Sequence, residues 1–65
     1  MKKEIGWDVT YTRAQAECDA KACVRDAMAE TKLPESAFEI MYDESVEHPK
    51  VVSWVVYQVS GTTTE

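Results

Sequence analysis

The residues of this sequence of 65 that could act as nucleophiles or as general acids and bases show no spacing typical of a catalytic site. His48 is the only histidine, and it directly follows Glu47. Chain neighbours rarely hold an imidazole and a carboxylate in working geometry, and no nucleophile stands at a spacing that ties it to this pair. The four serines lie outside any nucleophile-elbow motif, and neither glycine belongs to a phosphate-binding loop. We therefore expect a protein that is not an enzyme and has no catalytic residue.

The two cysteines, Cys18 and Cys23, are five residues apart in a predicted helix. At that spacing they point about 140° away from each other, so they cannot form a disulfide together. A single histidine also gives no zinc-binding pattern. Lys21 and Arg25 could activate a nearby thiol, but small filler in or near the core is the interpretation we favour. Unpaired thiols, with no signal peptide and no run of transmembrane length, predict a cytoplasmic protein without metal or cofactor.

Acidic residues are the most distinctive feature of the sequence. Between residues 30 and 47, six carboxylates stand against Lys32 alone, which accounts for the whole net charge of −5. This sign opposes direct binding to nucleic acid or to an anionic membrane. The acids fit either of two roles, protection of an edge strand against aggregation or an acidic ridge that docks on a basic protein surface. The predicted partner-binding residues are Glu35, Glu39, Asp43, Glu44, Glu47 and Trp54.

Four segments of regular structure would position these side chains. Residues 51–59 contain five valines and two aromatic residues and are apolar on both faces, which predicts a central strand. Residues 4–11 and 38–43 alternate apolar and polar side chains, as strands with one polar side do. Residues 13–31 predict a helix, which the capping box Thr12-Arg13-Ala14-Gln15 begins and Pro34 ends. Residues 44–49 are expected to form a hairpin loop, and residues 61–65 a disordered tail after a domain of residues 1–60.

The order strand-helix-strand-strand predicts an α+β domain. A right-handed crossover gives a three-stranded sheet in the order 1-3-2 with the helix on one face, half of a ferredoxin-like unit. The helix should pack through its wider apolar stripe, which consists of Ala16, Ala20, Cys23, Val24, Ala27 and Met28. The first strand should face the helix through its apolar row, which consists of Ile5, Trp7, Val9 and Tyr11. That arrangement would leave Trp54 and Val56 of the central strand on the open face of the sheet.

The small size of the domain predicts self-association. A chain of this length buries only about 60% of its unfolded surface, so its stability is marginal unless something adds to the core. Neither a disulfide nor a metal is expected here, which leaves oligomerisation as the available means of stabilisation. We expect a homo-oligomer, with the dimer as its simplest form.

In size and element order the chain resembles two kinds of small protein. Dodecins are strand-helix-strand-strand proteins that store flavin between stacked tryptophans, whereas here Trp7 and Trp54 lie in the first and third strands. In being short, acidic and without motifs, the chain is similar to small phage-encoded inhibitors such as anti-CRISPR proteins. The first hypothesis is accordingly a non-enzymatic acidic interaction protein, an inhibitor or adaptor that docks on a basic protein surface. The alternative is a dodecin-like flavin binder formed between subunits.

Overall fold

The computed structural model describes residues 2–47 and 49–59. Along the chain its elements are β1 (Lys3–Thr10), α1 (Arg13–Thr31), a 3-10 helix η1 (Glu35–Ala37), β2 (Phe38–Glu44) and β3 (Val52–Gln58). The strands form one sheet in the order β1-β3-β2, and β3 is antiparallel to both neighbours. These findings confirm the predicted α+β fold with its sheet order 1-3-2. His48 and the predicted tail of residues 61–65 lie outside the described residues.

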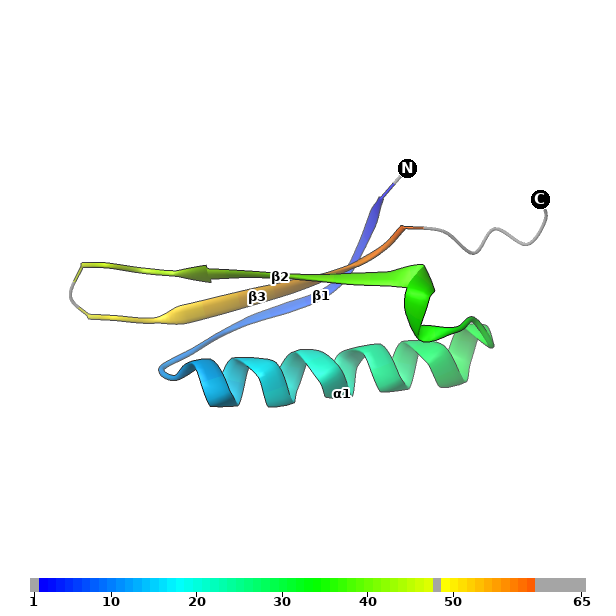
Figure 1. Cartoon of the computed structure of the whole chain (residues 1–65), viewed down its shortest axis with the longest axis horizontal. Coiled ribbons are helices and arrows are strands. Elements are labelled where there is room, and N and C mark those ends of the chain that lie inside the picture. The colour runs from blue at the N-terminus through cyan, green and yellow to red at the C-terminus, as the bar shows by residue number, and fades with distance from the viewer. Residues whose placement is uncertain (1, 48, 60–65) are drawn as a thin grey trace.

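The helix α1 forms a second layer that runs along one face of the sheet (Figure 1). It begins after Thr12, whose hydroxyl oxygen accepts a hydrogen bond from the Gln15 backbone amide at 3.1 Å. The second bond of the predicted capping box is not formed, because the Gln15 side chain donates to Asp19 Oδ1 at 2.8 Å instead. At the other end Lys32 adopts a left-handed conformation with φ of 63° and donates its N–H to the Met28 carbonyl. Such a cap satisfies a helix carbonyl that would otherwise lack a partner.

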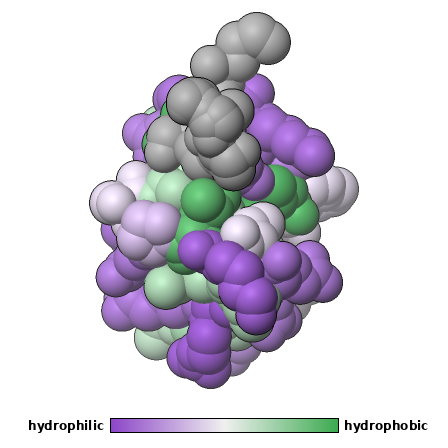
Figure 2. All heavy atoms as spheres, turned by 90° about the vertical axis from the view of Figure 1, so that its right-hand side faces the viewer, coloured by the Kyte–Doolittle hydropathy of each residue, from purple (hydrophilic) through white to green (hydrophobic). Residues whose placement is uncertain are grey.

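The hydrophobic core lies between α1 and the central strand. Ala16 and Ala20 of α1 have no exposed surface, and their small side chains let the helix approach the sheet closely. Opposite them, β3 buries Val52, Trp54 and Val56. Each fully buried side chain of valine size or larger stabilises the fold by about 1.5–3 kcal/mol. An end-on view shows hydrophobic residues gathered in the middle, with hydrophilic residues around them (Figure 2).

The faces of two strands are the opposite of those predicted. Trp7 of β1 is 64% exposed and Val9 is 46% exposed, so this apolar row does not face the helix. On β3, Trp54 is 7% exposed and Val56 is completely buried in the core that includes α1. The prediction that Trp54 and Val56 lie on the open face is therefore wrong.

The pairing of β2 with β3 explains this reversal. Residues directly opposite each other in a sheet project to the same side. Tyr42 lies opposite Trp54, and Ile40 lies opposite Val56, so the apolar row of β2 shares a face with these two residues of β3. The apolar row of β1 falls on the other face, because Trp7 lies opposite Val55. The helix covers the face that combines two apolar rows, and the apolar row of β1 remains on the other side.

A bulge in β1 completes the arrangement. The register with β3 shifts between Glu4 and Gly6, so Ile5 packs against the core although Trp7, two residues later, is exposed. Gly6 lies directly under α1, where an added Cβ atom would come 2.6 Å from the Cys23 sulfur. Thr10 is buried, and its hydroxyl hydrogen-bonds to the carbonyls of Thr12 and Val52, at 2.9 and 3.0 Å. The small and polar row of β1 thus fits beneath the helix.

Candidate functional site

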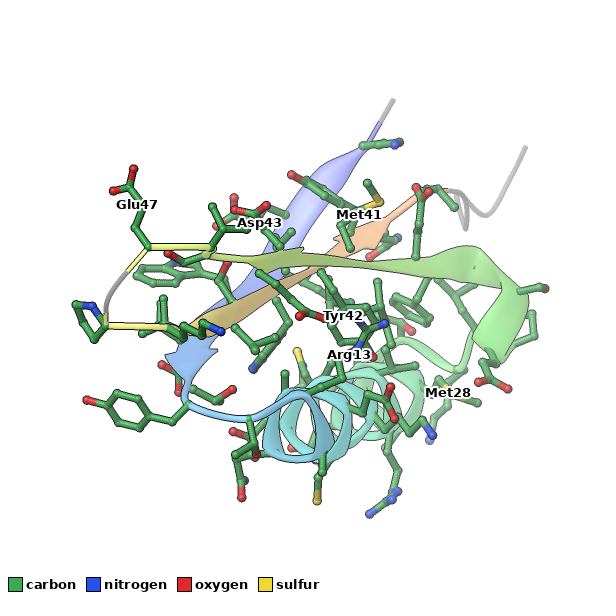
Figure 3. All side chains as sticks on the ribbon, turned by 60° about the vertical axis from the view of Figure 1, so that its left-hand side comes forward. Arg13, Met28, Met41, Tyr42, Asp43 and Glu47 are labelled. Carbon is green, nitrogen blue, oxygen red and sulfur yellow. The ribbon has the colours of Figure 1, made fainter. Side chains whose placement is uncertain are left out.

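The side of the sheet opposite α1, which we call the open face, carries three cross-strand rows. Each row takes one residue from β1, one from β3 and one from β2, and the register aligns them. The rows are Glu4–Tyr57–Glu39, Trp7–Val55–Met41 and Val9–Ser53–Asp43. The middle row is entirely apolar, whereas each outer row contains at least one carboxylate. Figure 3 shows Met41 and Asp43 on the side of β2 that faces away from α1.

A shallow hollow of about 500 Å³ lies over the middle of the open face. Trp7, Met41, Val55 and Tyr57 contribute apolar and aromatic surface to it. Met41 is 47% exposed, and together with the even more exposed Trp7 it makes this hollow a patch of unburied apolar surface. Clustered exposed apolar side chains with a polar rim are typical of interaction sites.

One cation already lies on the open face. The ammonium nitrogen of Lys2 is 2.9 Å from Glu39 Oε1 and 5.4 Å from the centre of the Tyr57 ring. The ion pair is half exposed, so its contribution to stability is small. Glu4 and Asp43, which also line the hollow, form no ion pair with any residue in the described part of the chain. These two carboxylates therefore stand beside apolar surface, and no charge among the described residues compensates theirs.

The predicted acidic ridge is divided among different surfaces. Glu44 lies on the helix side, where its carboxylate accepts a hydrogen bond from Arg13 at 2.9 Å. This bond is the largest cause that raises the pKa of Arg13, and the guanidinium also stacks over the Tyr42 ring, 4.1 Å from its centre. Arg13 and Tyr42 both lie between β2 and the helix in Figure 3. This contact joins β2 to the start of α1, and the partner-binding role of Glu44 stays a prediction.

The remaining predicted acids are also separated. Glu35 lies in η1 and lines a small hollow with Lys21 and Arg25 of α1. Glu47 lies in the loop after β2, where its backbone amide is bonded to the Ser45 hydroxyl. Of the five predicted acids only Glu39 and Asp43 share the open face. The partner-binding role of all five stays a prediction.

Trp54 is among the residues that line the hollow on the open face, but it is only 7% exposed. Its ring lies in the core, and its indole nitrogen is buried without a hydrogen-bond partner among the described residues. Sequence reasoning missed Trp7, Val55 and Tyr57 as open-face residues. The alternation of β2 could have identified them. One row of β2 is apolar and the other is largely acidic, and an acidic row must face away from the helix, which determines the faces of the neighbouring strands as well.

A second hollow, of about 630 Å³, lies between β1 and α1. Its lining includes Asp8, Asp19, Cys23 and Asp26. Burial, together with the nearby charge of Asp26, raises the pKa of the Cys23 thiol. A raised pKa keeps the thiol protonated and unreactive, which supports its interpretation as filler. Both cysteines are free, and Cys18 is exposed.

The chain matches no protein-family model, no curated protein and no solved structure. Within residues 2–47 and 49–59, no helix is long and apolar enough to cross a membrane. The same residues contain no group of three or more histidine, cysteine or acidic side chains suited to holding a metal ion.

Proposed function

We propose that this chain is a non-enzymatic protein-binding module of the cytoplasm, an inhibitor or adaptor whose open face docks on its partner. The observation that carries the proposal is the exposed apolar row Trp7–Val55–Met41, flanked by uncompensated carboxylates. The partner's contact surface would combine apolar side chains with basic ones. Such a surface would bury the apolar row and pair with Glu4 and Asp43.

The composition of the open face supports this proposal. Tryptophan and tyrosine are the residues that most often dominate binding energy at protein interfaces, and this face presents one of each, Trp7 and Tyr57. The face carries the carboxylates of Glu4, Glu39 and Asp43 against the single ammonium group of Lys2. An excess of one sign accelerates association with a partner of the opposite sign.

Site-specific photo-crosslinking tests the proposal. A photoreactive residue at position 41 would sample the open face, and the same residue at the exposed position Ala29 would sample the outside of α1. We expect a specific adduct from position 41 alone, and we expect the captured protein, once purified, to bind the unmodified chain. Adducts of equal yield from both positions would contradict docking through the open face.

A variant pair separates binding from folding. Trp7→Ser combined with Met41→Ser should abolish binding of the purified partner while cooperative unfolding persists, because neither side chain belongs to the core. Val46→Ser is the matched control, since Val46 is an apolar side chain that is even more exposed but lies in the loop after β2. Undiminished binding by the double variant would contradict the proposal.

A flavin binder formed between subunits is the second candidate, and the hollow beside Trp7 is the observation in its favour. The flavin would stack on Trp7, since Trp54 is buried. The carboxylates of Glu4 and Asp43 would repel the phosphate of a flavin nucleotide, which makes this candidate the weaker one. Purified protein that carries yellow flavin absorbance and quenched tryptophan fluorescence would favour it over protein docking.

A further inference from the structure

Resting on the proposed function, we infer that the occupant of the open face is a single amphipathic α-helix of the partner, with basic residues on both flanks of its apolar stripe. The helix would lie along β3, opposite α1, so that the sheet becomes the middle layer of three. Its apolar stripe would cover the row Trp7–Val55–Met41. Its basic flanks would reach Glu4 on one side and Asp43 on the other.

Backbone hydrogen bonding favours a helix as the occupant. The central strand β3 is paired on both sides, so the open face offers side chains and almost no free backbone groups. A single extended segment laid on this face would lose water from its own N–H and C=O groups without gaining partners. A helix satisfies these groups internally and can therefore bury one side at no such cost.

The width of the sheet also fits one helix. Three strands about 4.8 Å apart place the outer strands about 10 Å from each other, which is about the diameter of a helix. On the other face, the 19-residue helix α1 is the one layer that packs on β3. The open face has the same width, so one further helix would cover it.

Charge complementarity favours a basic partner over a second copy of this chain. Two copies packed face to face would oppose the carboxylates of Glu4, Glu39 and Asp43 with the same three groups, against one Lys2 from each. Lys2 itself shows what the face accepts, since its ammonium group lies between a carboxylate and the Tyr57 ring. Lysine or arginine of a partner could make the same kind of contact, a charge pair beside an aromatic ring.

The two uncompensated carboxylates set a spacing for the partner's basic residues. Glu4 lies opposite Tyr57 and Asp43 opposite Ser53, four residues apart on β3, which is about 13 Å along the strand. A helix rises by this distance in about nine residues, which turn it by about two and a half turns. Basic residues nine apart therefore project to opposite flanks. Glu4 and Asp43 also lie on opposite edges of the sheet, on β1 and β2.

Peptide titration tests the inference. The probe is a synthetic helix of about 18 residues with leucine on one side and lysine on both flanks. There are two control peptides. In the first every lysine is replaced by glutamate, and in the second a proline at the centre interrupts the helix. Binding is followed at about 0.15 M salt through the indole N–H resonances of the two tryptophans. We expect a saturable shift of the Trp7 resonance, a much smaller shift of Trp54, and binding of each control weaker by about tenfold or more.

Charge reversal identifies the carboxylates. Glu4→Lys and Asp43→Lys should each weaken the binding of the lysine peptide by about tenfold and strengthen the binding of the glutamate peptide. Asp26→Lys is the matched control, because Asp26 is an exposed carboxylate on α1 that lies away from the open face. If Asp26→Lys weakens the binding of the lysine peptide by the same factor, the binding is non-specific and the inference is overturned.

Other outcomes distinguish the inference from the proposed function. Equal binding of the lysine and proline peptides would overturn a helical occupant. A dimer that buries Trp7 at micromolar concentration without peptide would make a second copy the occupant. In either case an adduct from position 41 with a different protein would leave the proposed function standing. The absence of any such adduct would remove the proposed function itself.

Discussion

The two faces of the sheet are built from the same three strands, yet they differ in composition and in burial. The covered face combines an apolar row of β2 with the buried row of β3 and places small or polar residues of β1 beneath α1. The open face has a large apolar row from β1 and a largely acidic row from β2. The first arrangement stabilises the fold, because its apolar surface is already buried. The second leaves apolar surface available for a partner.

The comparison of the two tryptophans shows how position determines this difference. Trp7 and Trp54 lie in neighbouring strands and are one register position apart, since Trp54 lies opposite Asp8. Adjacent positions of a strand project to opposite faces, so one indole is in the core and the other in solvent. The same residue type therefore contributes to folding in one case and is proposed to contribute to binding in the other.

Alanine substitution of the two tryptophans should give the largest contrast. Trp54→Ala removes a buried ring and should destabilise the domain by about 3–5 kcal/mol, enough to unfold most of a chain this small. Trp7→Ala should change the free energy of unfolding by no more than about 0.5 kcal/mol, because the side chain is mostly exposed. Urea unfolding followed by circular dichroism measures both. Equal destabilisation by the two substitutions would contradict the assignment of the faces.

The close approach of β1 to α1 at Gly6 predicts the next largest effect. Gly6→Ala would force the Cys23 sulfur to move and should cost about 1–3 kcal/mol of stability, the usual penalty for overpacking. Cys23→Ala alone should cost about 1 kcal/mol as a small core truncation. In the Cys23→Ala background, Gly6→Ala should be much better tolerated. Additive effects in this double-mutant cycle would show that the two residues do not meet.

The partly buried Cys23 thiol predicts a moderate loss of stability in alkali. Burial raises its pKa above the ordinary value of 9.0, so the folded chain holds the proton more tightly than the unfolded chain. The resulting stabilisation is complete below pH 9 and falls as the pH rises through the folded pKa. Urea midpoints between about pH 8 and 10 should fall less steeply for Cys23→Ala than for the unsubstituted chain. Parallel slopes for the two proteins would contradict a thiol whose pKa is raised by partial burial.

The acidic residues should have the smallest effects on folding. Glu44→Gln removes the charge pair with Arg13, which is half exposed, and should cost less than about 1 kcal/mol. Asp43→Asn should change stability by no more than about 0.5 kcal/mol, because no described residue pairs with that carboxylate. Thermal unfolding of the two variants gives this comparison. A larger loss for Asp43→Asn than for Glu44→Gln would contradict the division of the acids between binding and structure.

Most of the fold could be predicted from the sequence because its signals are local. Helix bounds followed from the Thr12 cap and from Pro34, and the central position of β3 followed from its apolar character on both faces. The pattern of β1 alone could not show which face of the sheet the helix covers, because the apolar rows of β1 and β2 lie on opposite faces. The bulge at Ile5 was also not predictable from the alternation of apolar residues, because the pattern continues through it unchanged.

The candidate site was predicted only in part. The sequence correctly indicated that an apolar row would remain uncovered, but it indicated the wrong row. It also grouped the acids by their closeness in the chain. Ion pairs such as Arg13–Glu44 join residues that are far apart in sequence, and only the fold reveals which carboxylates remain uncompensated.

Accessibility of the two indoles tests the central claim most directly. Trp54→Phe leaves Trp7 as the only tryptophan, and Trp7→Phe leaves Trp54 as the only tryptophan. Both changes retain an aromatic ring. Neutral acrylamide, added to dilute protein, should quench the fluorescence of Trp7 far more strongly than that of Trp54, because Trp7 is 64% exposed and Trp54 only 7%. Stronger quenching of Trp54 would place the core on the other side of the sheet and would contradict binding through the open face.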